Sequence, residues 1–326
     1  MTTFEFLSQL KTLDVRVWLE GDRLRCSAPS AVLTPELQGE LSNRKEDILT
    51  FLRAAKTWAE PTTSSLVPLQ PAGNQRPFFA VPGHNGDVFC FVPLARHLTA
   101  DQPIYGLQPP GVDGQQPPLM RVEDLAAHFV KDIRLFQPEG PYRIGGYCLG
   151  GVIAFEIAQQ LHAQGQQVET LVLFGSPSPT SFCLSQRMYS ATFQFVQKLV
   201  RHAKTLQGLS PLRWRQYVSE RNRQRQEEQD QYYRHNPYRR QVEDATVNAV
   251  RQYKARVYPG RITLFFSSEH PVNLTTDRLL NWRAFTAGGL EIHAGPAACD
   301  GDTMLLEPHA QVFAELLQTN LHKALN

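Results

Sequence analysis

The sequence predicts an α/β protein whose mostly parallel sheet lies between helices, preceded by a much smaller α+β unit. From residue 66 onward, short apolar runs alternate with longer amphipathic stretches, which is typical of strand and helix layers. The expected strands are 78–81, 103–107, 142–144, 170–174, 262–266 and 288–293, and the expected helices are 92–98, 122–136, 152–163 and 308–317. We therefore expect a large domain over residues 65–326.

Residues 1–53 form the smaller unit. The apolar spacing of residues 4–10 predicts a helix, and the alternating residues 15–20 and 24–26 flank a Gly21-Asp22 turn, which predicts a hairpin. Thr34 is a good N-cap, and Pro35 suits the first position of a second helix. Because about 50 residues build only a marginal core, this unit is best explained as a docking module. Residues 54–64 lose the periodicity and gain Pro, Thr and Ser, as a linker does.

Composition excludes several classes of protein. The formal net charge of +2 leaves no electrostatic footprint for nucleic acid. No run approaches the roughly 18 apolar residues of a membrane helix, and the N-terminal residues do not resemble a secretory signal. Five cysteines at irregular spacing indicate reduced thiols and no metal site. We expect a cytoplasmic protein without metal or nucleic-acid partner.

Residues 180–255 interrupt the strand and helix alternation. They have a helical pattern and are rich in Arg, Gln and Tyr. One interpretation is a solvated helical insertion. The other is a lid over the active site whose basic face also meets an acidic carrier protein.

The strongest chemical signal is the stretch Gly146-Tyr147-Cys148-Leu149-Gly150. It has the form G-x-C-x-G between a predicted strand and a predicted helix, which is a nucleophile elbow carrying cysteine. The glycines allow the tight turn that exposes the Cys148 side chain at the edge of the sheet. The helix that follows presents amide N–H groups and a partial positive charge, both of which favour a thiolate.

A second glycine-containing loop follows the strand at 78–81. Gly83 or His84 in this loop could offer a backbone N–H to a developing oxyanion, together with the N–H of Leu149. The side chain of His84 is either an ordinary loop residue or a polar group that reaches the active centre.

Residues 66–317 resemble the thioesterase domain of nonribosomal peptide and polyketide synthases, an α/β-hydrolase fold. The resemblance rests on LVPLQPAGNQRPFFAVPG, PIYGLQPPGVDG, VEDLAAHFV, GPYRIGGYCLGG, GRITLFFSSE and TMLLEPHAQVFAELL. Residues 4–53, with VRVWLEGDRLRCSAP, LTPEL and RKEDIL, resemble the TubC-type N-terminal docking domain. The resemblance implies a carrier protein that presents substrate on phosphopantetheine, no bound cofactor, and an upstream synthase subunit whose C-terminal tail binds residues 4–53.

The resemblance also shows two departures from the family pattern. Gly175 stands where the family carries the aspartate of its catalytic triad, and Gly301 stands where it carries the histidine. A serine nucleophile would be nearly inert without a base, whereas a cysteine is partly ionised already. The cysteine and the two glycines are therefore consistent with one another.

Several residues could supply the missing acid–base function. Glu269 follows the strand at 262–266, where other α/β hydrolases place the triad acid; Asp300 and Asp302 flank Gly301; and His84 lies in the oxyanion loop. His270 is better explained as a loop residue, and His293 and His309 as structural residues.

Three hypotheses about function follow. The first is an enzyme that accepts an acyl chain on Cys148 and releases, cyclises or transfers it. The second is a non-catalytic scaffold that binds a loaded carrier protein. The third is carbon–carbon ring closure of a carrier-bound β-keto chain in the same pocket.

Overall fold

The chain consists of two compact units, Met1–Ser64 and Ser65–Asn326. The computed structural model describes residues 15–20, 23–27, 34–45, 48–49, 64–182, 237–267, 281–296, 299, 301 and 303–323. The helix predicted at 4–10 and residues 54–63 of the predicted linker lie outside this set.

The described part of the smaller unit is a hairpin and a helix. Strands β1 (Arg16–Glu20) and β2 (Arg23–Ser27) pair antiparallel, with Val17 opposite Cys26. Helix α2 (Pro35–Asn43) begins after Thr34, whose Oγ1 accepts a hydrogen bond from the N–H of Leu37 at 3.3 Å. The predicted hairpin and N-cap are thus both present.

The larger unit is built on a seven-stranded sheet in the order β3-β5-β4-β6-β7-β8-β9. Its strands are β3 (Leu66–Gln70), β4 (Phe78–Val81), β5 (Ile104–Leu107), β6 (Tyr142–Tyr147), β7 (Val168–Phe174), β8 (Ile262–Phe266) and β9 (Leu290–Ala294). Only the edge pair β3–β5 is antiparallel, and every other pair is parallel. The prediction of an α/β protein with a mostly parallel sheet is confirmed.

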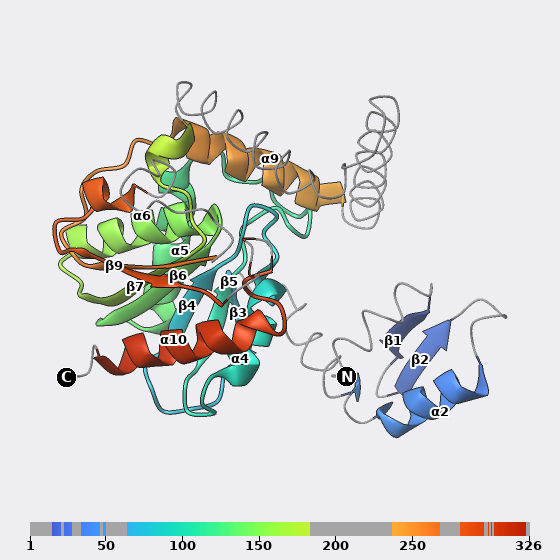
Figure 1. The fold of residues 1–326 in the computed structure, drawn as a ribbon. Helices are drawn as coiled ribbons and strands as arrows, with labels where there is room; N and C mark the ends of the chain where they lie inside the picture. The colour runs from blue at the N-terminus through green and yellow to red at the C-terminus, as the bar shows by residue number, and fades with distance from the viewer. Residues whose placement is uncertain are drawn as a thin grey trace, which may run out of the picture. The chain divides into compact units, whose positions relative to one another are not determined.

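Helices cover both faces of this sheet (Figure 1). The α-helices are α4 (Val92–His97), α5 (Val122–Phe136), α6 (Gly150–Ala163), α9 (Pro237–Gln252) and α10 (His309–Lys323), and short 3₁₀ turns occupy η1 (Val88–Phe91), η2 (Pro179–Phe182) and η4 (Trp282–Phe285). In β4, Phe79 and Val81 pack in the core beneath α5 and α6, whereas Phe78 and Ala80 pack in the core beneath α4 and α10. This alternation is the two-residue period of a strand buried on both faces.

A buried arginine holds β6 in register. The Arg143 side chain is 1% exposed, and its Nε donates to Glu169 Oε2 of β7 at 2.7 Å. Its Nη1 donates to Gln102 Oε1 at 2.9 Å. Buried charges need such partners, and here the partners connect β6, which leads into the Cys148 turn, to β7 and to the segment before β5.

The predicted insertion spans residues 180–255, of which residues 183–236 lie outside the described residues. Helix α9 forms most of the remainder. Its C-terminal end is anchored to α6, because Tyr253 Oη donates to Glu156 Oε2 at 2.6 Å and accepts from Gln159 Nε2 at 2.9 Å. Burial, together with the bond to Glu156, raises the pKa of Tyr253 far above its usual range. The phenol therefore remains a hydrogen-bond donor at every physiological pH.

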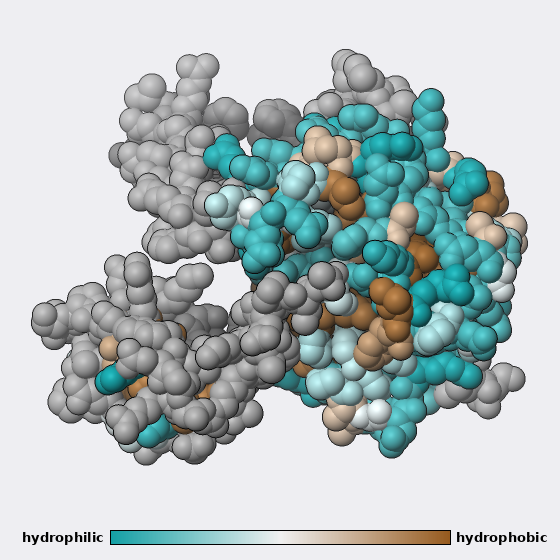
Figure 2. All heavy atoms as spheres, turned by 180° about the vertical axis from the view of Figure 1, so that it is seen from behind, coloured by the Kyte–Doolittle hydropathy of each residue, from teal (hydrophilic) through white to brown (hydrophobic). Residues whose placement is uncertain are grey.

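The described residues include no helix that is both long and apolar enough to cross a membrane. On the face shown in Figure 2, the described surface is mostly hydrophilic, and its apolar side chains form small groups. Exposed large apolar side chains include Met120, Leu135 and Val257.

Candidate active site

Cys148 occupies a strained turn between β6 and α6. Its φ is +51°, and it is the only residue other than glycine with a positive φ among the described residues. A bulky residue reaches this region only at a cost in free energy, and such outliers gather at functional sites. Its N–H donates to the carbonyl of Phe174 in β7 at 2.9 Å. The half-buried Cys148 side chain therefore stands at the carboxyl end of the central strands.

Three glycines permit this turn by close approach of neighbouring elements. A Cβ atom on Gly146 would collide with the carbonyl of Gly150, one on Gly150 with the carbonyls of Val81 and Pro82, and one on Gly151 with Ser176 Oγ. Two of these contacts involve backbone that cannot rotate away. The G-x-C-x-G spacing is thus a packing requirement, as the sequence analysis expected.

Gly83, at the start of the predicted oxyanion loop, lies beside the nucleophile. A Cβ atom on Gly83 would be 3.8 Å from Cys148 Cβ and 3.4 Å from the ring of Tyr147. Leu149 directly precedes α6, and the first amides of a helix have no partner within it. The backbones of Gly83 and Leu149 therefore both lie next to Cys148.

The loop after Gly83 is closed by local hydrogen bonds. The N–H of Gly86 donates to the carbonyl of Gly83 at 3.1 Å, and Gly86 has φ +69°. Asp87 Oδ1 then accepts from the N–H of Phe89 at 3.2 Å and caps η1. The loop is thus a compact turn held at both ends.

A second thiol, Cys90 of η1, also contacts this loop. Burial and the neighbouring charge of Asp87 raise the pKa of Cys90 well above its ordinary value, although the Gly83 backbone forms a hydrogen bond with the sulfur. Cys90 is close enough to Cys148 for a thiolate there to raise the pKa further. Cys90 therefore remains a neutral thiol next to the nucleophile.

Two ion pairs join the loop to α9. His84 Nε2 lies 3.6 Å from Glu243 Oε1, and Arg239 Nη1 lies 3.4 Å from Asp87 Oδ1. Arg239 and Glu243 are one helical turn apart and so share a face of α9. The sequence analysis did not identify either residue. The only signal for them in the amino-acid sequence is their four-residue spacing, which places both on one face of a helix.

The two glycines at the family's acid and base positions differ in their surroundings. Gly175 has φ +55°, and a Cβ atom there would be 2.8 Å from Met304 Sδ. Gly301 is exposed, and no atom of a described residue lies within 4 Å of the position of a Cβ atom there. The carbonyl of Gly301 accepts a hydrogen bond from Tyr147 Oη at 2.7 Å, so this position is next to the elbow.

The remaining candidates are not all described. Glu269, His270, Asp300 and Asp302 lie outside the described residues. His293 of β9 pairs with Glu291 at 3.0 Å, and its ring packs at 5.4 Å from that of Phe265. No cluster of three or more His, Cys, Asp or Glu residues arranged to hold a metal ion occurs in the part of the chain that the structure describes.

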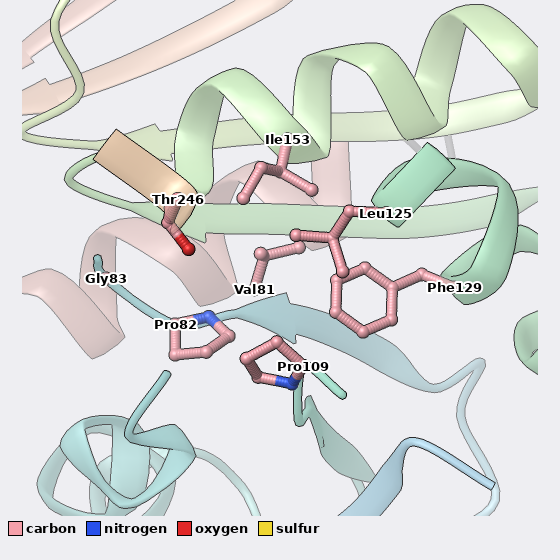
Figure 3. A pocket seen from close by; sticks show the side chains of 8 residues that line it. All are labelled: Val81, Pro82, Gly83, Pro109, Leu125, Phe129, Ile153 and Thr246. Atoms are coloured by element: carbon pink, nitrogen blue, oxygen red, sulfur yellow. The ribbon is translucent and has the colours of Figure 1, made fainter. Parts of the chain in front are cut away.

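A small apolar cavity adjoins the oxyanion loop (Figure 3). Its volume is about 10 Å³, room for roughly one water molecule. Side chains of α5, α6 and α9 meet the end of β4 there, and the lining residues are Val81, Pro82, Gly83, Pro109, Leu125, Phe129, Ile153 and Thr246. Thr246 of α9 is its one polar side chain.

Comparison with known families agrees with this geometry. The model of the thioesterase domain matches residues 76–319, and that of the TubC N-terminal docking domain matches residues 4–54. The chain belongs to the thioesterase-domain family. The α/β-hydrolase interpretation and the resemblance to TubC-type docking domains are both confirmed.

Relatives of this thioesterase-family chain are much larger synthases. Malpibaldin synthetase of Mortierella alpina is 28% identical over 71% of the chain and 4% of its own length. Polyketide synthase PksR of Bacillus subtilis is 36% identical over 42% of the chain and 5% of its own length. The NocB thioesterase domain, solved as a covalent complex with a fluorophosphonate nocardicin G analogue, superposes with a TM-score of 0.55 at 22% identity, covering 78% of this chain and 99% of that one. The chain thus spans a small fraction of these synthases, and its thioesterase-like part has the fold of an isolated thioesterase domain.

We predict that iodoacetamide at pH 7 alkylates Cys148 more than about tenfold faster than Cys90, since each unit of raised pKa lowers the thiolate fraction tenfold. Peptide mass mapping over time measures both rates. In a Cys148→Ala variant, Cys90 should stay unmodified. Equal rates at the two cysteines would contradict the assignment of Cys90 as a half-buried thiol that stays neutral.

Proposed function

We propose that this protein accepts an acyl or peptidyl chain from the phosphopantetheine of a carrier protein onto Sγ of Cys148 and then passes it to an acceptor. The observation that carries the proposal is the positive φ of Cys148 at an elbow that lies between Gly83 and the start of α6. Backbone strain of this kind gathers at functional sites, where it is part of the mechanism.

The first half-reaction is thiol exchange. The Cys148 thiolate attacks the thioester carbonyl, and a tetrahedral oxyanion forms next to the N–H of Leu149 and the backbone of the 83–86 loop. The bond from the carbonyl carbon to the pantetheine sulfur then breaks, and that sulfur leaves as a thiol after taking up a proton. Substrate and product are both thioesters, so the step is nearly balanced in energy and readily reversible.

The acceptor that discharges acyl-Cys148 is expected to be a nucleophile within the bound acyl or peptidyl chain itself, or the thiol of a second carrier protein. Water needs a base to activate it, and the family's acid and base positions hold Gly175 and Gly301. Cyclisation or transfer is therefore favoured over hydrolysis, although the acyl-enzyme would still hydrolyse slowly.

The docking unit supports the choice of partner. Residues 4–54 match a docking domain, and the relatives are multidomain synthases. We infer that this unit binds the C-terminal tail of an upstream synthase subunit and so brings its carrier protein to Cys148. No bound cofactor is needed, because the substrate arrives already activated as a thioester.

A non-catalytic scaffold is the second candidate, and the specific observation in its favour is the glycine at both positions 175 and 301. A scaffold that only binds loaded carrier would have no use for the strained geometry of Cys148. We therefore propose acyl transfer by Cys148 as the function in preference to a non-catalytic scaffold.

Incubation with an acyl-pantetheine thioester is expected to raise the intact mass by one acyl group. The gain should be absent from Cys148→Ala. Addition of a free amine or a carrier thiol should discharge the adduct faster than water does. If no adduct forms with acyl-pantetheine or with a carrier that bears the matching docking tail, the scaffold function is correct.

The lifetime of that adduct tests the role of position 301. A Cβ atom meets no described residue at this exposed site, so Gly301→His should shorten the lifetime of acyl-Cys148 in water by about tenfold or more, within the range of general-base effects. Gly175→Asp is the matched control, because Met304 occupies the space that its side chain would need. If both variants leave the lifetime unchanged, the missing base does not limit hydrolysis.

A further inference from the structure

The loop beside Cys148 contains one histidine, and α9 supplies a carboxylate to it. We propose that His84 and Glu243 form the histidine–carboxylate pair that serves Cys148, in place of a pair at positions 301 and 175. This proposal rests on the proposed function of Cys148 as an acyl acceptor. It adds Glu243 as the residue that positions the imidazole.

The position of His84 follows from that of Gly83. A Cβ atom on Gly83 would lie 3.8 Å from Cys148 Cβ, and consecutive Cα atoms are about 3.8 Å apart. His84 therefore directly follows the residue, Gly83, that lies against Cys148. Its side chain is 44% exposed, and Nε2 faces Glu243 of α9 at 3.6 Å.

Glu243 is a partly buried carboxylate that faces His84. Its Oε2 is buried and has no hydrogen-bond partner among the described residues, whereas Oε1 lies 3.6 Å from His84 Nε2. A buried carboxylate oxygen without a donor is costly. The imidazole of His84 is the partner that the described residues offer to this carboxylate, so Glu243 positions the ring through Nε2.

Helix α9 holds Glu243 in this position by contacts on both sides. One turn earlier, Arg239 pairs with Asp87 at the far end of the loop. Val242 Cγ1 lies 3.2 Å from the position of a Cβ atom on Gly86, so the helix packs directly on the loop. Tyr253 and Glu156 fix the C-terminal end of α9 on α6.

The other described histidines with a carboxylate partner lie elsewhere. His97 of α4 pairs with Glu307 at 2.7 Å, His128 of α5 lies 3.9 Å from Asp132, and His293 of β9 pairs with Glu291 at 3.0 Å. Each of these histidines lies outside the 83–87 loop and the Cys148 turn. Among the described histidines with such a partner, His84 is the one that directly follows Gly83, the residue beside Cys148.

The chemistry balances with these two residues. With Nε2 directed at Glu243, His84 Nδ1 takes the proton of the Cys148 thiol, and the thiolate attacks the carbonyl carbon of the incoming thioester. The imidazolium then returns the proton to the departing pantetheine sulfur. Histidine suits this exchange because its ordinary pKa is close to neutral pH.

The other ionisable groups near His84 and Cys148 have partners or protonation states of their own. Among the described residues, Arg239 and Asp87 neutralise each other, Cys90 of η1 stays protonated, and the Tyr147 hydroxyl donates to Gly301. Glu243 is therefore the described carboxylate whose charge acts on His84 without a neutralising arginine.

The test is the pH dependence of the rate at which iodoacetamide alkylates Cys148 in the full-length protein, followed by peptide mass mapping. In the native chain the half-maximal rate should occur below the roughly pH 8.5 of an ordinary cysteine. In His84→Asn it should occur at least about one pH unit higher, so the rate at pH 6 falls about tenfold. Glu243→Gln should shift it in the same direction by a smaller amount.

His97→Asn is the matched control, since it breaks another histidine–glutamate pair of the same unit and should leave the profile unchanged. Thermal unfolding of each variant establishes that it is folded, and Glu243→Gln, which keeps the shape of the side chain, serves if His84→Asn does not fold. Native profiles in both His84→Asn and Glu243→Gln would overturn the proposal and leave the pair as a contact that only holds α9 on the loop.

The experiment needs no acyl substrate, so it separates this proposal from the proposed function. A profile that depends on His84 in a protein that never acquires an acyl group would contradict acyl transfer and support the pair. An acyl adduct on Cys148 with a profile independent of His84 would contradict the pair alone.

Discussion

The site depends on one backbone constraint, the positive φ at which Cys148 is held between β6 and α6. The turn exists because α6 approaches β4 and β6 so closely that Gly146, Gly150 and Gly151 leave no space for a Cβ atom. The same approach places Gly83 of the β4 loop beside Cys148. Cys148 and the loop that begins at Gly83 are thus parts of one packing arrangement, which the buried Arg143–Glu169 pair supports at the other end of β6 and β7.

A cysteine in this arrangement explains how the family's acid and base positions could be lost. A thiol ionises near neutral pH and attacks a thioester without complete removal of its proton by a strong base. At Gly175, Met304 now lies against the position, whereas at Gly301 the space remains open. The two glycine positions therefore differ: a side chain at position 175 would meet Met304, whereas a side chain could be restored at position 301 by a single substitution.

Local sequence patterns were sufficient to predict most of what lies within one element or turn. The G-x-C-x-G spacing, the strands of the parallel sheet and the Thr34 cap each follow from a period or from a residue's own backbone preference. Glu243, Arg239, Met304 and Cys90 could not be predicted, because they reach the site through tertiary packing of segments 40 or more residues apart, or through a burial that composition does not show. Glu269, Asp300 and Asp302 stay predictions, because they lie outside the described residues.

The most direct test of the account is a crystal structure of the protein with an acyl aldehyde analogue of the pantetheine substrate bound to Cys148 as a hemithioacetal. The account predicts a covalent bond to Cys148 Sγ, with the hemithioacetal oxygen about 2.7–3.1 Å from the backbone nitrogen of Leu149 and from a backbone nitrogen of the 83–86 loop. An oxygen directed away from both nitrogens, or an aldehyde bound without a bond to Cys148, would contradict the assignment of this elbow as the acyl-transfer site.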